Sequence, residues 1–365
     1  MKKVFVYLLV LIGILFSKGL YADDLRSGMS FYYRQLDNRN GLSNSSVNTI
    51  LQDKDQLLWI GTWDGLNRYD GAQFNVYNHN IDQAENSIGS NVIQAINEDN
   101  AGNIWVNTIG GISKYHKSSG KFYRYFYRSS TSKKISENEF ELAINAKGEV
   151  YCYSAEGVLS KYNIAEDKFI TYQKFVGESG IAKMYFHDNL LWCLNKKGDL
   201  SVYQTKGNQL KVVKKISEKV LNFFIVNNHI IYSLNNNSHF KINADYKIQQ
   251  IDIDQKRIKT IAFYKNNYVI AWENQGIGIY DNQFKPSSIL QAETKRLENL
   301  KITALKVSHN EVLWLGTDGN GLIQIYPKEN YFGLLTKISG NPINKPIRSF
   351  SEVNQNLWVG TKGNG

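Results

Sequence analysis

The sequence is poor in the residues that mark several large classes of protein. It has 2 cysteines and 4 prolines among 365 residues, so it is neither a disulfide-rich scaffold nor a proline-rich linker. Beyond the amino terminus, no run approaches the ~18 consecutive apolar residues that mark a membrane-spanning helix. No convincing amphipathic helical periodicity follows the amino terminus either. We therefore expect a chain built from strands.

Recognisable catalytic, cofactor and metal motifs are also missing. The sequence has no Gly-x-Ser-x-Gly elbow and no phosphate-binding loop, and Gly276-Ile277-Gly278 lacks the third glycine of a dinucleotide site. The net charge is +10, but the basic residues are interspersed with acidic ones and form no run typical of a nucleic-acid surface. The six histidines are scattered without the short spacing of a zinc site. We expect no cofactor, no metal, no nucleic-acid partner and no catalytic residue.

The first 22 residues have the features of a secretory signal peptide. Lys2 and Lys3 form a basic start, residues 4–16 are apolar, and Ala22 suits a cleavage site. The apolar run has 13 residues, fewer than the ~20 that a spanning helix needs, so a retained membrane anchor is the weaker alternative. We expect export of the chain, cleavage after Ala22 and a mature chain without a membrane span of its own.

A unit of about 43 residues recurs along the mature chain. Its clearest copy has four short apolar segments, at 46–53, 57–62, 65–70 and 74–77, separated by Gly, Asn and Asp turn residues. The second segment of each copy carries an anchor residue, and successive anchors are 38 to 46 residues apart. The anchors are Trp59, Trp105, Tyr151, Trp192, Tyr232, Ile270, Trp314 and Trp358. This period suits the four-stranded blade of a propeller.

The repeat predicts an all-β fold, a seven-bladed β-propeller of four-stranded antiparallel blades over residues 23–340. An early strand at 32–36 is expected to pair into the last blade and close the ring. The anchor tryptophans should fill the space between blades, and Gly61 and Gly316 should lie where no side chain fits. Cys152 and Cys193 occupy equivalent positions in neighbouring repeats, so we expect two buried side chains, although a disulfide stays open.

Residues 341–365 are expected to be the truncated start of a second propeller at the carboxyl terminus. Trp358 is an eighth anchor, and the sequence stops at Gly365, inside the turn after the second segment of that repeat. We therefore expect a truncated form of a longer protein, with an incomplete eight-bladed ring as the alternative.

The segments 41–47, 58–62 and 65–71 resemble the two-component regulator propeller repeat, strongly near both ends of the chain and weakly from about residue 140 to 300. The resemblance implies the N-terminal periplasmic sensor part of a hybrid two-component system histidine kinase. In that family two periplasmic propellers precede a membrane helix and the kinase. It further implies an oligosaccharide ligand, a homodimer partner and downstream kinase modules. This chain lacks the kinase, so no catalytic residue is carried over.

In a propeller, the turn between the second and third strands and the connection between blades lie on one face, where ligands collect. Here those turns combine an aromatic residue with amides and carboxylates, which suits a sugar. The candidate ligand-binding residues are Trp63, Asp64, Asn107, Glu273, Asn274, Asp318 and Asn320. Since Asn and Asp are also ordinary turn formers, a purely structural role is the alternative for each residue.

We expect a periplasmic sensor domain that recognises an oligosaccharide, or relays its recognition, and that is not itself an enzyme. One alternative is a secreted propeller enzyme acting on polysaccharide, which would gather paired acids or a His and Tyr cluster on the loop face. The other is a purely structural propeller that supports dimerisation.

Overall fold

A computed structural model describes residues 30–83, 86–125, 140–154, 157–175, 180–207, 209–243, 245–328, 337–338, 341–342, 345–353 and 356–362. The chain divides into two compact units, Met1–Pro327 and Lys328–Gly365. The expected signal peptide lies outside the described residues. Within the described part, no helix has both the length and the apolar character needed to cross a membrane.

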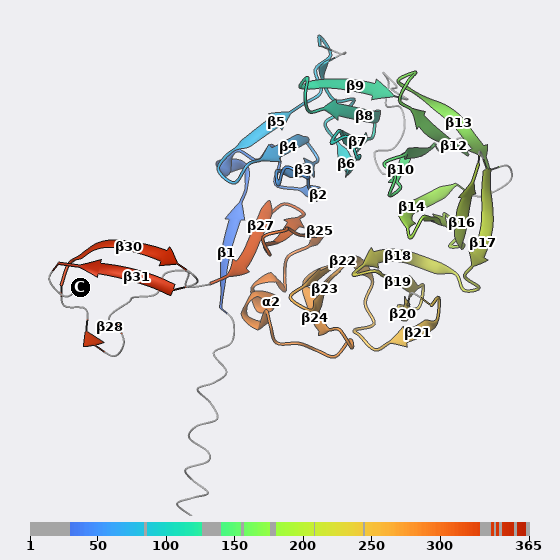
Figure 1. The fold of residues 1–365 in the computed structure, drawn as a ribbon. Helices are drawn as coiled ribbons and strands as arrows, with labels where there is room; N and C mark the ends of the chain where they lie inside the picture. Colours follow the sequence, from blue (N-terminus) through green and yellow to red (C-terminus); the bar gives the residue numbers. More distant parts are fainter. Residues whose placement is uncertain are drawn as a thin grey trace, which may run out of the picture. The chain divides into compact units, whose positions relative to one another are not determined.

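The first unit is a ring of seven antiparallel sheets, which confirms the predicted fold class (Figure 1). Blade one contains β2 (Val47–Gln52), β3 (Leu58–Thr62), β4 (Gly65–Tyr69) and β5 (Phe74–Tyr77). Blade two contains β6 (Ile93–Glu98), β7 (Ile104–Thr108), β8 (Gly111–His116) and β9 (Lys121–Tyr125). Blade three contains β10 (Phe140–Ile144), β11 (Val150–Ser154), β12 (Val158–Asn163) and β13 (Lys168–Lys174).

The remaining four blades complete the circle. Blade four contains β14 (Ile181–His187), β15 (Leu190–Asn195), β16 (Leu200–Lys206) and β17 (Gln209–Lys215). Blade five contains β18 (Val220–Val226), β19 (His229–Leu234), β20 (His239–Ile242) and β21 (Ile248–Ile251). Blade six contains β22 (Ile258–Tyr264), β23 (Asn267–Trp272) and β24 (Ile277–Asp281). Blade seven contains β25 (Ile302–Val307), β26 (Leu313–Thr317), β27 (Leu322–Pro327) and β1 (Phe31–Leu36).

The ring is closed by β1, as the sequence predicted. β1 runs antiparallel to β27, with Phe31 opposite Pro327 and Leu36 opposite Leu322. The first strand of the unit therefore completes its last blade. The short 3-10 helix η1 (Asn38–Asn40) follows β1 and leads into blade one.

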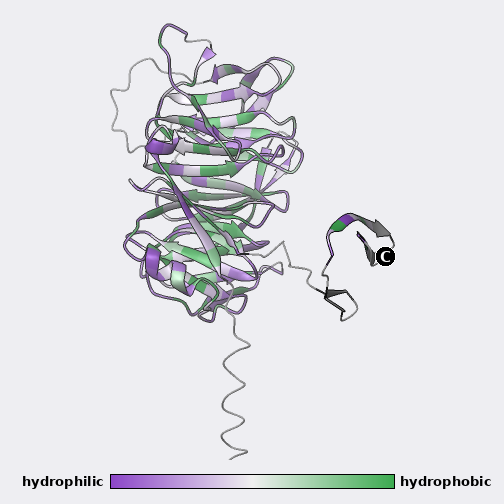
Figure 2. Cartoon of the chain, turned by 90° about the vertical axis from the view of Figure 1, so that its left-hand side faces the viewer, coloured by the Kyte–Doolittle hydropathy of each residue, from purple (hydrophilic) through white to green (hydrophobic). Residues whose placement is uncertain are grey.

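The core lies between blades, because each cluster of buried apolar side chains draws mainly on two neighbours. Trp59 of blade one is fully buried and belongs to one cluster with Ile93 and Ile104 of blade two. A Cβ atom added to Gly61 would come within 2.5 Å of the Ile93 side chain, and one added to Gly316 within 2.6 Å of the Val47 side chain. The predicted roles of the anchor tryptophan and of both glycines are thereby confirmed. Figure 2 shows hydrophobic residues on strands throughout the ring, interspersed with polar ones.

Blade six departs from the predicted four strands. Among the described residues, the edge of β24 pairs only through the single bridge between Tyr280 and Pro286, and helix α2 (Gln291–Leu297) follows in place of a fourth strand in the sequence. Leu290 and Leu297 at the ends of this helix are buried in the cluster shared by blades six and seven. The sequence analysis found no convincing helical periodicity here, because a helix of 7 residues is too short to produce a clear one.

Cys152 in β11 and Cys193 in β15 are both buried, as expected from their equivalent positions, and no disulfide joins them. Burial raises the pKa of the Cys152 thiol, and Glu141 adds to this shift. The Cys152 side chain therefore stays protonated and unreactive at neutral pH.

The second unit has two small antiparallel pairs, β28 (Lys337–Ile338) with β29 (Asn341–Pro342), and β30 (Ile347–Val353) with β31 (Asn356–Thr361). The pairing of Ser349 with Gly360 follows a register shift of the same kind as the one before Thr49 and Gly61 in blade one. β30 and β31 thus repeat the first two strands of a blade. The start of a second propeller stays a prediction.

Candidate functional site

The turns between second and third strands share one face of the ring with the connections between blades. In blade one, the backbone N–H of Trp63 donates to Ser46 O (3.2 Å) in the connection that enters the blade. The N–H of Gly65 donates to Asn91 O (2.8 Å) in the connection to blade two. Equivalent bonds run from Gly276 to Leu300 O (2.9 Å) and from Gly319 to Ser45 O (3.1 Å). These bonds link neighbouring blades through the face that the sequence analysis singled out.

Trp63 and Asp64 form the exposed turn of blade one. The Trp63 side chain is 44% exposed, unlike the anchor Trp59, which is fully buried. Asp64 Oδ1 accepts a hydrogen bond from Asn91 Nδ2 (2.9 Å). An aromatic ring that is half exposed beside a fixed carboxylate is suited to stack on the apolar face of a sugar.

The turn of blade seven carries Asp318 and Asn320. Asp318 forms an ion pair with Lys301 (2.8 Å) and accepts a hydrogen bond from Ser46 Oγ (3.1 Å). The hydrogen bond from Lys301 is the main cause that lowers the pKa of Asp318, so this carboxylate is charged at neutral pH. The Asn320 side chain is exposed, while its backbone carbonyl accepts from Gln35 Nε2 (2.8 Å).

The turn of blade six carries Glu273 and Asn274, both exposed. Glu273 lies 3.7 Å from Arg257 in a loose ion pair, and its N–H donates to Arg257 O (2.8 Å). Blades six, seven and one are neighbours in the ring (Figure 1), so six of the seven predicted residues occupy consecutive turns on one face.

Asn107 lies apart from the other six predicted residues. It belongs to β7, its exposed fraction is 3%, and its Nδ2 donates to Phe140 O of blade three (3.3 Å). This contact ties blade two to blade three beneath the loop face.

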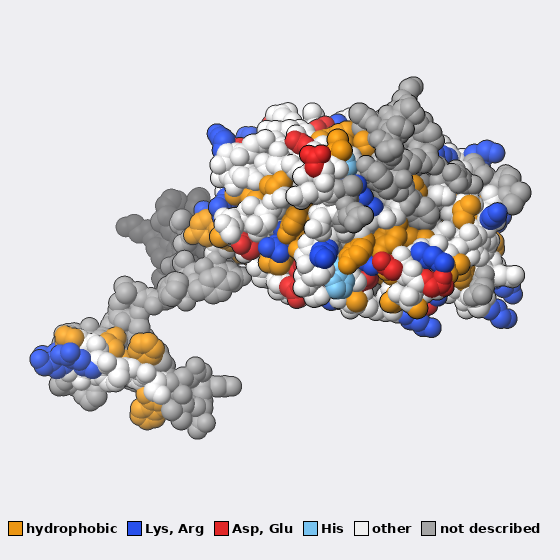
Figure 3. All heavy atoms as spheres, turned by 90° about the horizontal axis from the view of Figure 1, so that it is seen from above, with side chains coloured by type: hydrophobic (Ala, Val, Ile, Leu, Met, Phe, Trp, Pro, Cys, Tyr) orange, Lys and Arg blue, Asp and Glu red, His pale blue; other side chains and the backbone are white. Residues whose placement is uncertain are grey.

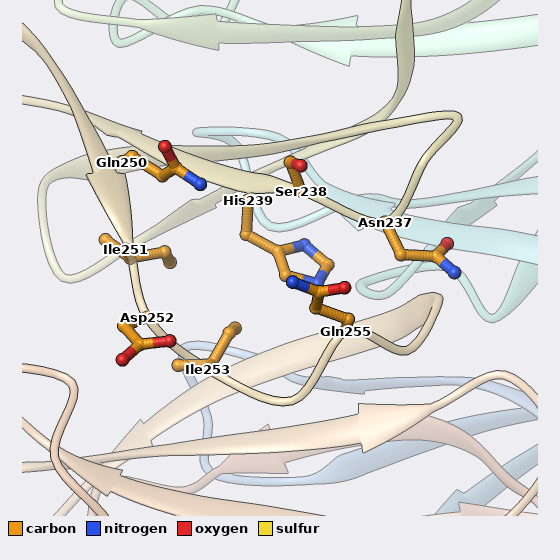
Figure 4. A pocket seen from close by; sticks show the side chains of 8 residues that line it. All are labelled: Asn237, Ser238, His239, Gln250, Ile251, Asp252, Ile253 and Gln255. Atoms are coloured by element: carbon orange, nitrogen blue, oxygen red, sulfur yellow. The ribbon is translucent and has the colours of Figure 1, made fainter.

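A polar pocket of about 290 Å³ lies on the same face at blade five, where no ligand-binding residue was predicted (Figure 4). One wall is the turn that ends in Asn237 and Ser238, and His239 begins β20 below it. The other wall is the end of β21 at Gln250 and Ile251, followed by the connection through Asp252, Ile253 and Gln255. The lining offers amides, a hydroxyl, an imidazole and one carboxylate.

His239 lines this pocket as a buried, neutral imidazole. Its exposed fraction is 1%, and its Nδ1 lies 2.8 Å from Ser233 Oγ. Burial lowers the pKa of His239, although the backbone of Asp254 and Lys256 acts in the opposite direction. Its Nε2 and the Oδ1 of Asn237 are buried and have no hydrogen-bond partner among the described residues. A histidine at the start of a third strand, after the Asn-rich turn 235–237, is the signal that could have drawn attention to this place.

A second group of polar residues lies on the innermost strands of blades four and five. Lys183 Nζ donates to Asn222 Oδ1 (2.8 Å) and Phe223 O (2.7 Å), and it lies 4.3 Å from the centre of the Phe224 ring. Burial lowers the pKa of Lys183 to about 7, while Glu141 acts in the opposite direction. These bonds join β14 to β18 and so hold two blades together.

Charges are mixed among the residues coloured on one face of the molecule. On the face drawn in Figure 3, lysine and arginine side chains alternate with acidic ones and form no extended patch of one sign. Among the described residues, no group of three or more His, Cys, Asp or Glu side chains is placed to hold a metal ion.

Comparison with known proteins connects the repeat to a family. Residues 41–64 and 87–110 match the model of the two-component regulator propeller family, so the chain carries at least two such repeats. A histidine kinase, P4, from Formosa agariphila is 44% identical over 55 residues, which are 15% of this chain and 4% of that protein. The resemblance seen in the sequence is confirmed.

Solved structures share the fold. The extracellular domain of a putative hybrid two-component system from B. thetaiotaomicron has a TM-score of 0.63 at 23% identity, over 92% of this chain and 47% of that one. A virginiamycin B lyase from Staphylococcus aureus has a TM-score of 0.59 at 13% identity, over 81% of this chain and 99% of that one. This chain thus spans about half the length of the hybrid-system domain and a small part of the kinase.

Proposed function

We propose that this chain is the sensor portion of a hybrid two-component system, that it lies in the periplasm, and that it recognises an oligosaccharide or relays its recognition. The observation that carries the proposal is the match of two repeats to the two-component regulator propeller family. The shared fold with the extracellular domain of a hybrid two-component system supports it. Downstream kinase modules and a second copy of the protein would be the partners of the complete protein.

The loop face supports a sugar as the ligand. Exposed Trp63 offers a stacking surface, while Asp64, Asp318 and Glu273 offer carboxylates held by neighbouring side chains. Carboxylates and amides in fixed positions accept hydrogen bonds from hydroxyl groups, and an aromatic ring covers the apolar face of a pyranose. The turns belong to neighbouring blades, so a ligand that contacts several turns would favour one relative position of those blades.

The first experiment is a thermal-shift screen of the purified chain against a library of defined oligosaccharides, followed by calorimetry on each hit. A saturable rise in melting temperature with one class of sugar is the expected result, because a ligand that binds only the folded state stabilises it. Trp63→Ala should weaken that binding. Trp358→Ala is the matched control, since Trp358 is 66% exposed in the second unit.

If a well-folded sample shows no rise in melting temperature with any glycan, this chain does not bind the ligand. The structural alternative, a propeller that supports dimerisation, then predicts a dimer by sedimentation without any sugar. Equal loss of binding in the two tryptophan variants would contradict a role for Trp63 in particular.

We propose recognition without turnover. Hydrolysis of glycosides commonly uses a pair of carboxylates. On the loop face, Asp64, Asp318 and Glu273 are each engaged by a different side chain, namely Asn91, Lys301 and Arg257. Asp252 is the one carboxylate among the residues that line the pocket of blade five. The rival is an enzyme acting on polysaccharide; the lyase that shares the fold shows only that an enzyme can have this fold. Assays for released products with pooled polysaccharides separate the two, because turnover would contradict the sensor proposal.

A further inference from the structure

We propose that the pocket of blade five binds one neutral sugar unit of the oligosaccharide, whose hydroxyl groups exchange hydrogen bonds with His239 Nε2 and Asn237 Oδ1. This inference rests on the proposed function and names a place and a ligand class for it. It goes beyond the exposed turns of blades six, seven and one, because the pocket lies on blade five.

The first argument is the state of the two buried atoms. His239 Nε2 and Asn237 Oδ1 make no hydrogen bond of normal geometry with a described residue, although both are removed from solvent. The backbone of Asp254 and Lys256 comes near enough to the His239 ring to act on its pKa, without completing such a bond. A buried polar atom without a hydrogen bond is unfavourable, so native structures satisfy nearly all of them through protein, water or ligand. Both atoms belong to residues that line one cavity, but neither atom is open to solvent there, so a single ligand would satisfy both once the two side chains turn toward it.

The second argument is the chemical character of a hydroxyl group. The hydrogen bond between Ser233 Oγ and His239 Nδ1 can run in either direction. If the serine donates, Nε2 carries the proton and needs an acceptor; if Nδ1 donates, Nε2 needs a donor. A hydroxyl group serves in both cases, and it can also donate to Asn237 Oδ1. A ligand rich in hydroxyl groups therefore fits either tautomer.

The third argument is charge. The lining contains the carboxylate of Asp252 and no lysine or arginine. Asp254 lies next along the connection, where Lys256 forms an ion pair with it at 3.1 Å. A carboxylate or sulfate on the ligand would face Asp252 without a cation in the lining to offset the repulsion. The pocket therefore favours a neutral sugar over a uronic acid.

The fourth argument is size. A volume of about 290 Å³ lies at the lower end of ligand pockets, which span roughly 300–1,000 Å³. It accommodates one sugar ring and not a longer chain, so the rest of an oligosaccharide would extend along the loop face. Ile251 and Ile253 add apolar surface to the lining, which suits the C–H groups of a pyranose ring.

The test uses the full chain labelled with ¹⁵N-histidine. The imidazole signals are followed by NMR during titration with glucose, galactose, mannose, xylose and arabinose, and with glucuronic and galacturonic acid as charged probes. We expect a saturable shift of the His239 signals with at least one neutral sugar and a much weaker response to the two acids. His229 is the internal control, because it lies at the other end of the same blade, also with a buried unpaired ring nitrogen and a pKa lowered chiefly by burial.

Two variants make the test specific. His239→Phe keeps an aromatic ring but removes Nε2, and it should weaken sugar binding about tenfold or more, the size expected when a site built for a hydroxyl loses its partner. His229→Gln should leave binding unchanged. Because His239→Phe also removes the contact to Ser233, Asn237→Ala serves as a second variant from the rim, with circular dichroism as the check of folding.

The outcomes separate this inference from the function on which it rests. If oligosaccharides bind the chain but His239→Phe and Asn237→Ala bind equally well, the pocket is not the site and the inference falls while the function stands. Tighter binding of the uronic acids would overturn the neutral ligand class. If no sugar shifts His239 and none binds the chain, both proposals fall.

Discussion

Asp53 offers the sharpest test of how the blades are held together. Its carboxylate is fully buried and accepts hydrogen bonds from Leu57 N (2.9 Å) and Trp59 Nε1 (2.7 Å). It also pairs with Lys117 of blade two at 2.8 Å. One side chain thus fixes the first turn of blade one, orients its anchor tryptophan and contacts the next blade.

The expected cost of Asp53→Ala follows from these three partners. The change leaves the Leu57 N–H and the Trp59 indole N–H without acceptors, each at about 1–3 kcal/mol. Lys117 keeps Asp55 and Glu98, both at 3.0 Å, so its charge is not left unpaired. We therefore expect a loss of about 3–5 kcal/mol in the free energy of unfolding. At ~2.1 cal/mol/K per residue, a unit of about 300 residues would lose roughly 5–8 °C in melting temperature.

Asp55→Ala is the matched control. Asp55 pairs with the same lysine, but its side chain is 67% exposed, so its removal should cost at most about 1 kcal/mol. Urea unfolding followed by tryptophan fluorescence gives the midpoint and slope for both variants. Equal losses in the two variants, or a loss below about 1 kcal/mol for Asp53→Ala, would refute the reasoning.

Three further predictions concern the ring. Leu36→Ala, at a side chain 1% exposed in the closing strand, should cost about 2–5 kcal/mol in urea unfolding, and a loss near zero would mean that β1 does not hold the ring closed. Gly61→Ala should cost about 1–3 kcal/mol because its Cβ would meet Ile93, whereas Gly180→Ala, whose Cβ would have no contact closer than 3.6 Å, should change the midpoint little; equal effects would contradict the close packing of blades one and two. Because the pKa of Lys183 falls from 10.5 to about 7, the unfolded chain binds more protons between these values, so the stability contribution of this lysine should rise from pH 7 to pH 10. Lys183→Met should remove that rise, and an unchanged pH dependence would refute it.

The repeat made the ring predictable, because its evidence is spread over many positions. The same aromatic anchor, glycine and turn residues recur at nearly constant spacing, and equivalent residues make equivalent contacts in different blades. Trp59 and Trp105, for example, are both buried and both donate to an aspartate at the preceding turn. The closing strand could be predicted for a similar reason, since β1 precedes the first repeat and supplies the fourth strand beside β25, β26 and β27 of the last one. The three-stranded form of blade six was not predicted, because the segment after β24 forms the short helix α2, which leaves no clear pattern in the sequence.

The candidate site was only partly predictable. Turn positions follow from the repeat, so the placement of Trp63, Glu273 and Asp318 on one face could be foreseen. The burial of Asn107 could not be foreseen. The last residues of a second strand lie either in the exposed turn or under it, and here the contact with Phe140 of the next blade holds Asn107 under the turn. The pocket around His239 depends on a hydrogen bond and a connection whose geometry no sequence pattern specifies.

The closing strand also determines how the ring responds to force. Phe31 and Pro327 form the same end of the antiparallel pair β1 and β27, so the polypeptide enters and leaves the ring at adjacent points. Tension that pulls these two residues apart would break the hydrogen-bonded pairs between β1 and β27 one after another. It would not load all of these pairs at once, as shear along the strands would. The seam between β1 and β27 is therefore where the ring would open first under load. During synthesis, β1 must wait for its partner until nearly 300 residues later in the chain have been made.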